Sequence, residues 1–128
     1  MIGIWSQYSQ AYLLCLAIST SLVFALPIFL LPLRWARLMG WIIPEHTHLA
    51  IYFGRCLGAF ILIVEALMFR AALTGEAIRV TFEVLAAVAL LMVLVHVYGA
   101  LRRIQPLSET LEILMYSGML LLTLLFWP

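Results

Sequence analysis

Four long runs of apolar residues constrain this chain more than any other feature of its sequence. They cover about 9–33, 49–73, 80–101 and 109–127, and each approaches or exceeds the roughly 20 residues that a helix needs to cross a bilayer. Membrane-spanning strands would instead show segments of about ten residues with alternating polarity. The sequence therefore predicts an all-α, polytopic membrane protein with four transmembrane helices in an up-down bundle. We expect a single integral membrane domain over 1–128.

The composition excludes a water-soluble fold. Hydrophobic residues make up 66% of the chain and charged residues 10%, whereas an ordinary soluble domain has about 45–50% and about 25%. Folding buries only about two-thirds of the surface of a chain of this size, so a soluble fold would expose large apolar patches. The net charge of +1 and the lack of an arginine-rich stripe argue against a nucleic-acid partner. The lipid bilayer is the expected surrounding.

The arginines predict the orientation in the membrane. Four of them lie in the loops after the first and third runs, which share one side: Arg34, Arg37, Arg102 and Arg103. The other side has Arg79 and, at the end of the second run, Arg70. Because cytoplasmic loops carry an excess of basic residues, we expect both termini on the non-cytoplasmic side of a bacterial inner membrane.

Five ionisable residues fall within the predicted spans, where each is costly and is a functional candidate by default. A helical rise of 1.5 Å per residue places Arg55 about 9 Å and His96 about 7 Å inside the cytoplasmic ends of their helices. Glu65, Arg70 and Glu83 lie toward the opposite leaflet. These residues are candidates for intramembrane polar contacts, and none of them belongs to a recognisable catalytic motif.

Glu65 shares a predicted helix face with two glycines. Gly54 and Gly58 form a GxxxG pattern, and Glu65 follows Gly58 after seven residues, which is about 20° short of two full turns. Such a face lets another helix approach closely, so Glu65 is expected to face protein rather than lipid. We favour a structural pairing of Glu65 with Arg70 or with a donor on another helix. The alternative is a proton-relay or ligand-binding carboxyl group.

The three histidines raise the question of a cofactor or a metal. His96 could be an axial ligand of haem or of a chlorophyll-type pigment, but we expect no cofactor and a neutral His96 that donates a hydrogen bond across helices. Glu45, His46 and His48 could bind a metal through two imidazoles and a carboxylate. Polar residues at the level of the lipid headgroups explain this stretch as well, so no metal is expected.

Polar and aromatic residues border the spans. Ser108 is expected to cap the fourth helix, with Glu109 and Glu112 near the positive end of its dipole. Trp35 and Trp41 in the loop 33–48 are typical of aromatic anchors at a membrane interface.

Two stretches carry a resemblance to a known group of proteins. Arg55-Cys56-Leu57-Gly58 leads into a long apolar helix, and Gly99-Ala100-Leu101-Arg102-Arg103 ends the third run before Gln105-Pro106. In these stretches, in size and in its four crossings, the chain resembles the small four-helix bacterial membrane proteins of the DoxX-like group. That resemblance implies kinship with a group that includes proposed quinone-linked redox components, and it assigns no catalytic residue.

Two classes of function follow. The absence of any reaction motif and of a soluble domain favours a non-enzymatic accessory or assembly subunit, whose partners are other membrane protein subunits. The alternative is a self-contained membrane redox or transport unit in which Glu65, Arg55 and His96 handle protons, quinone, or a bound pigment or haem.

Overall fold

The computed structural model describes residues 2–128. Within this range the fold is all-helical and contains four helices long and apolar enough to cross a membrane: Ser6–Leu30, His48–Thr74, Ile78–Arg102 and Leu107–Leu125. The predicted all-α fold with four membrane spans is confirmed. The later three spans begin and end within two residues of their predicted bounds.

The first span is not a continuous α-helix. A 3₁₀ turn, Ser6–Tyr8 (η1), leads into α1 (Ser9–Thr20), a π-helical turn follows at Ser21–Ala25 (η2), and α2 (Leu26–Leu30) completes the crossing. The helix breaks at Leu31 (φ −135°) because Pro32 lacks an N–H and disfavours helical geometry in the residue before it. A separate short helix, α3 (Pro32–Leu38), then begins. The predicted span 9–33 is thus too long at its C-terminal end.

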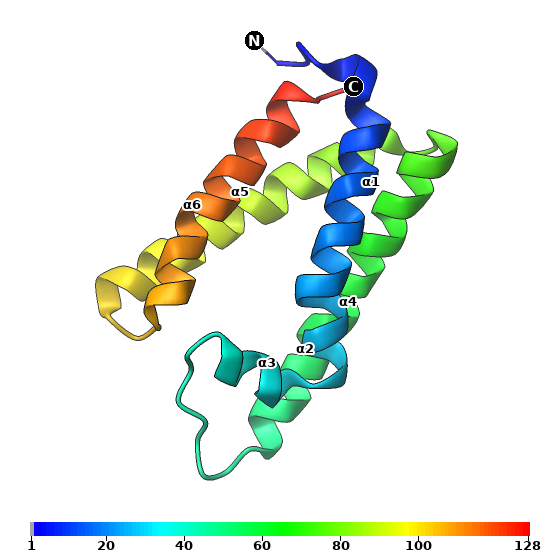
Figure 1. Cartoon of the computed structure of the whole chain (residues 1–128). Coiled ribbons are helices and arrows are strands. Elements are labelled where there is room, and N and C mark those ends of the chain that lie inside the picture. The colour runs from blue at the N-terminus through cyan, green and yellow to red at the C-terminus, as the bar shows by residue number, and fades with distance from the viewer. Residues whose placement is uncertain (1) are drawn as a thin grey trace.

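The four spans form two helix pairs that meet at one end. α4 (His48–Thr74) packs against α1 and α2, and α6 (Leu107–Leu125) packs along α5 (Ile78–Arg102). The pairs converge where both termini and the α4–α5 turn lie, and they diverge toward the opposite end (Figure 1). Gly75 makes that turn with φ 74°, a left-handed conformation that glycine adopts without strain.

The apolar core lies at the convergent end. It consists of Leu13, Ala17, Met68, Ala71, Ala72, Phe82 and Leu85. Several of these side chains are small, which lets helix backbones approach and pack closely, as association in a bilayer requires. The chain ends are joined there as well, since the Gly3 N–H donates to the Leu124 carbonyl at 2.9 Å and the Tyr12 and Thr123 hydroxyls lie 2.8 Å apart.

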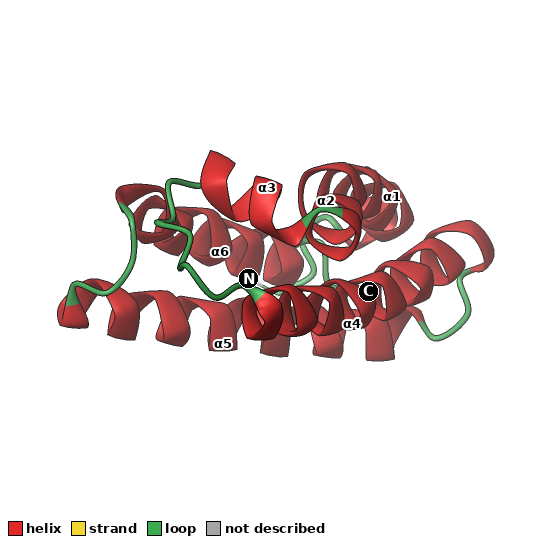
Figure 2. Cartoon of the chain, turned by 90° about the horizontal axis from the view of Figure 1, so that it is seen from below, coloured by secondary structure: helices red, strands yellow, loops and turns green. Residues whose placement is uncertain are grey.

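At the divergent end, α3 and the segment 39–47 join α2 to α4 along the chain and contact the α5–α6 pair. Seen from below, this segment runs from α3 past α6 to the start of α4 (Figure 2). The Ser108 hydroxyl donates to the Met39 carbonyl, and Gly40 (φ 84°) lies against Pro106. These contacts place Trp41 beside the first turns of α6.

Candidate functional site

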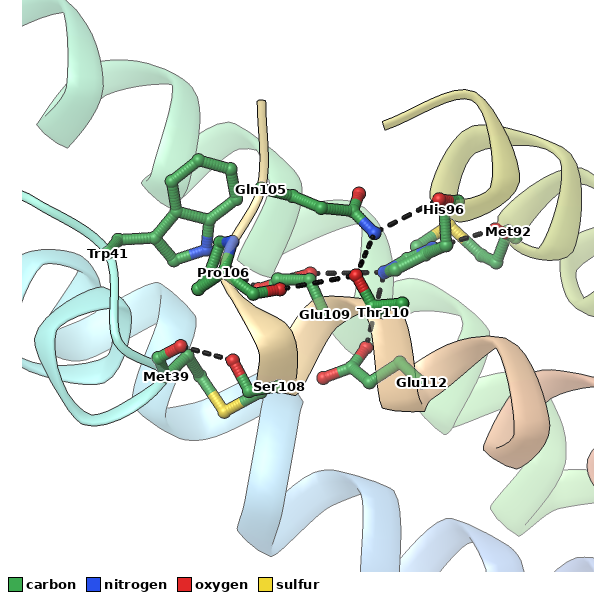
Figure 3. Close-up of polar contacts among 10 residues, drawn as sticks. All are labelled: Met39, Trp41, Met92, His96, Gln105, Pro106, Ser108, Glu109, Thr110 and Glu112. Carbon is green, nitrogen blue, oxygen red and sulfur yellow. Dashed lines mark hydrogen bonds and ion pairs between the residues drawn. The ribbon is translucent and has the colours of Figure 1, made fainter. Parts of the chain in front are cut away.

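Three buried side chains with ionisable groups gather at the divergent end of the α5–α6 pair. His96 comes from α5, Glu109 and Glu112 come from α6, and they are exposed by 3%, 8% and 7%. His96 Nε2 lies 3.0 Å from Glu109 Oε2 and 3.4 Å from Glu112 Oε2 (Figure 3). Elsewhere in residues 2–128, no three histidine, cysteine or acidic side chains come together in this way. We call His96, Glu109 and Glu112 the His–Glu–Glu cluster.

The geometry of a helical hairpin brings the cluster together. His96 lies six residues before the end of α5, and Glu112 lies five residues after the start of α6. At 1.5 Å per residue both are about 8–9 Å from the connecting loop, so they share one depth. Glu109 and Glu112 are three residues apart and therefore occupy the same face of α6.

The orientation of the His96 ring is fixed by its own helix. Nδ1 lies 2.7 Å from the carbonyl oxygen of Met92, which can only accept, so Nδ1 carries the hydrogen. This leaves Nε2 directed at the two carboxyl groups. The ring also packs against Tyr116, with 5.2 Å between ring centroids.

Trp41, which lies outside the α5–α6 hairpin, binds the carboxyl group of Glu109. Its indole Nε1–H donates to Glu109 Oε1 at 2.7 Å, and the other oxygen of Glu109 faces His96. A hydrogen bond to a carboxylate is short and strong, and it fixes the rotamer of the acceptor. The segment 39–47 therefore contributes directly to the site.

Gln105, in the loop between α5 and α6, binds both helices next to the cluster. Its amide Nε2–H₂ group donates to the His96 carbonyl at 3.0 Å and to the Thr110 hydroxyl at 3.1 Å. A Cβ atom at Gly99 would clash with Gln105 Oε1, so the glycine provides the space for this amide. The loop that joins the two helices thus supplies hydrogen bonds to the His96 carbonyl and the Thr110 hydroxyl.

Glu112 is the least satisfied member of the cluster. Its Oε1 atom is buried and has no hydrogen-bond partner among the described residues. The arginine ion pairs of the described chain lie elsewhere, between Arg70 and Glu76 and between Arg79 and Glu83. A buried acceptor left without a partner costs about 1–3 kcal/mol, and more when it is charged. Two carboxyl groups and one imidazole therefore lie together without a basic side chain to balance them, which suits them to hold a cation.

Glu65 lies outside this cluster. It is 4% exposed and accepts a hydrogen bond of 3.1 Å from the Ser21 hydroxyl at the start of η2. Arg70 instead pairs with Glu76 at 2.6 Å, so the ion pair considered between Glu65 and Arg70 is not formed. The donor to Glu65 is Ser21, which belongs to the first span. This matches the alternative expectation from the sequence, a donor on another helix.

The glycine face of α4 is occupied within the chain. A Cβ atom at Gly54 would lie 2.6 Å from Pro32 Cβ, and one at Gly58 would lie 2.5 Å from the Phe29 backbone nitrogen. Both glycines therefore serve the contact of α4 with α2 and α3.

The remaining candidates do not join a common site. Arg55 is exposed on α4, and Glu83 lies 4.0 Å from Arg79 on the surface of α5. Within the described residues, Glu45, His46 and His48 do not bring their ligand atoms together as a metal site requires. For His96, the Glu109 and Glu112 carboxyl groups lie within 3.4 Å of Nε2, on the side from which a haem or pigment would have to approach.

The sequence analysis did not identify Glu109, Glu112 and Trp41 as partners of His96. Ser108 was expected to be the N-cap of the fourth helix, but this is wrong, because the helix starts at Leu107 and the Ser108 hydroxyl binds the Met39 carbonyl. The cluster could have been predicted from one feature of the sequence. His96 and Glu112 are at nearly equal distances along their helices from the short loop that joins them.

No family model, curated protein or solved structure matches the chain. The resemblance to the DoxX-like group therefore stays a prediction.

Proposed function

We propose that the protein is a small, non-enzymatic accessory or assembly subunit of a larger membrane complex. The divergence of the two helix pairs is the observation that carries this proposal. In the diverging halves, apolar side chains such as Leu57 on α4 and Leu94 on α5 are 52% and 57% exposed. Helices in a bilayer associate through close packing, so an open arrangement leaves faces that helices of another subunit can fill.

The proposal includes a location and an orientation. The four apolar spans make this a multi-pass membrane protein, and the resemblance to the DoxX-like group suggests the bacterial inner membrane. The excess of arginines after the first and third spans supports cytoplasmic loops there and non-cytoplasmic termini. In this orientation the His–Glu–Glu cluster lies near the cytoplasmic surface.

Photo-crosslinking in native membranes tests the subunit role. A photoreactive amino acid at position 57 or 94 is expected to form an adduct with a larger chain that also co-purifies in stoichiometric amount. The same amino acid in place of Leu121, which is 58% exposed near the convergent end, is the matched control. A protein that purifies alone and forms no adduct from positions 57 and 94 contradicts the proposal.

A second candidate function is favoured by the buried His–Glu–Glu cluster. A self-contained redox or transport unit needs ionisable groups at membrane depth, and this cluster supplies three. The absorption spectrum of gently purified protein separates haem or pigment chemistry from the subunit role. A Soret or chlorin band that is lost in His96→Ala would support the second candidate, whereas a colourless protein with stoichiometric partners supports the first.

A further inference from the structure

We infer that His96, Glu109 and Glu112 form a binding site for one divalent transition-metal ion, of the class that includes Zn²⁺, Fe²⁺ and Mn²⁺. This site is independent of the proposed subunit role, because it is built entirely from one hairpin and the segment 39–47. Four observations carry the inference: the spacing of the ligand atoms, their supporting hydrogen bonds, their charge and their chemistry.

The spacing fits a small ion. One ligand atom from each of the three residues lies within 4.8 Å of the other two. Around a tetrahedral ion with bonds of about 2.0–2.2 Å, neighbouring ligand atoms are roughly 3.3–3.6 Å apart. The distances from His96 Nε2 to the two carboxylate oxygens, 3.0 Å and 3.4 Å, are close to that value. Small rotations of the glutamate side chains are enough to admit the ion.

The supporting hydrogen bonds are those of a metal ligand set. A metal-binding histidine donates its other ring N–H to a carbonyl or carboxylate, which fixes the tautomer. His96 does this through Nδ1 and the Met92 carbonyl, so Nε2, which faces the two carboxyl groups, is the nitrogen that would bind the ion. Glu109 is held in the same manner by Trp41 at its outer oxygen. Both ligands are therefore oriented before any ion arrives.

The charge of the site matches a divalent cation. With both carboxyl groups ionised and the imidazole neutral, as metal ligands require, the cluster has two negative charges, which a divalent ion balances. Burial of unbalanced charge is strongly unfavourable in a low-dielectric surrounding. Glu112, which is 7% exposed, directs its carboxyl group toward His96 with one oxygen unpartnered among the described residues. That oxygen is available as a further ligand atom.

The donor types restrict the kind of ion. Imidazole and carboxylate suit Zn²⁺, Fe²⁺ and Mn²⁺, whereas Cu⁺ prefers the soft sulfur ligands that this cluster does not include. Three protein ligands leave a coordination position for water or for another molecule.

Titration with Co²⁺ tests the site directly. Full-length protein is purified in detergent, stripped with a chelator and titrated while its visible d–d absorption is recorded. We expect one Co²⁺ per chain in the wild type. Glu112→Gln and His96→Gln should weaken binding by at least about tenfold at unchanged helix content, because each removes a ligand or its charge. A double variant of His46→Gln with His48→Gln, and separately Glu83→Gln, should bind like the wild type.

Three results would overturn the inference. These are no stoichiometric Co²⁺ binding by the well-folded wild type, unchanged binding by Glu112→Gln, or loss of binding in the His46→Gln, His48→Gln variant. Failure of the metal site leaves the crosslinks from positions 57 and 94 unaffected, and failure of those crosslinks leaves the Co²⁺ titration unaffected. The two proposals can therefore fail separately.

Discussion

His96 Nε2 and Glu109 Oε2 lie 3.0 Å apart although they belong to different helices, and both side chains are buried within the helical part of the chain. The contact exists because α5 and α6 are joined by a short loop and run antiparallel, which returns α6 to the depth of His96 within two to five residues. A buried imidazole–carboxyl contact of this kind ties the two helices together and defines their register.

The role of Trp41 can be tested by removing one hydrogen bond. Trp41→Phe deletes the indole N–H that donates to Glu109 and keeps an aromatic ring. Loss of a hydrogen bond to a charged acceptor costs about 1.5–3 kcal/mol, and we expect a decrease of that order in the free energy of unfolding in mixed detergent micelles. Trp5→Phe is the control, since Trp5 contacts Phe126 through its ring. Equal stability of the two variants would show that the segment 39–47 does not hold Glu109.

Two glycines on different helices provide a matched pair for the packing of α4. Gly58→Ala places a Cβ atom 2.5 Å from the backbone of Phe29, whereas Gly118→Ala on α6 meets nothing within 4 Å. Overpacking of this kind costs about 1–3 kcal/mol, so Gly58→Ala should lower both the unfolding free energy and the amount of protein in the membrane. Gly118→Ala should be neutral or stabilising by up to about 1 kcal/mol, because alanine favours the helix. The prediction fails when the two variants behave alike.

Glu65 should tolerate loss of its charge. In Glu65→Gln the side-chain carbonyl can still accept the hydrogen bond from Ser21, so the unfolding free energy should change by less than about 1 kcal/mol. Abundance in the membrane and co-purification with partner chains should both persist. Normal abundance together with lost partners or lost function would instead assign chemistry to this carboxyl group.

The orientation can be read by labelling single cysteines in intact cells. Cys15 and Cys56 are first replaced by alanine, and one cysteine is introduced at Glu76 or at Arg103. These positions lie in the turns after α4 and α5, at opposite ends of the spans. We expect a membrane-impermeant maleimide to label position 76 directly and position 103 only after permeabilisation. The reverse pattern would contradict the orientation inferred from the arginines.

The spans were predictable because their signal is local. Each of the last three runs is predominantly apolar over about 20 residues or more, and that length of apolar sequence indicates a crossing. The break at Leu31 was only partly predictable, since Pro32 can either kink or end a helix. The packing of α4 against α2 fixes the outcome, because Gly54 lies against the Pro32 ring and Gly58 against the backbone of Phe29.

The His–Glu–Glu cluster depends on contacts that no local pattern contains. Glu109 and Glu112 are equally suited to the positive end of a helix dipole, and that interpretation needs no partner. Only the pairing of α5 with α6 turns them toward His96. The contribution of Trp41 is harder still to anticipate, because it lies 68 residues from Glu109 along the chain.

X-ray absorption at the zinc edge of the Zn²⁺-loaded protein tests the metal centre most directly. We predict a first shell of nitrogen and oxygen at about 2.0–2.2 Å, with the scattering of a single imidazole and no sulfur. The same spectrum should be obtained when His46 and His48 are both replaced by glutamine. A sulfur shell at about 2.3 Å, or scattering from two imidazoles, would place the ion at a cysteine or at His46 and His48, and would contradict a site formed by His96, Glu109 and Glu112.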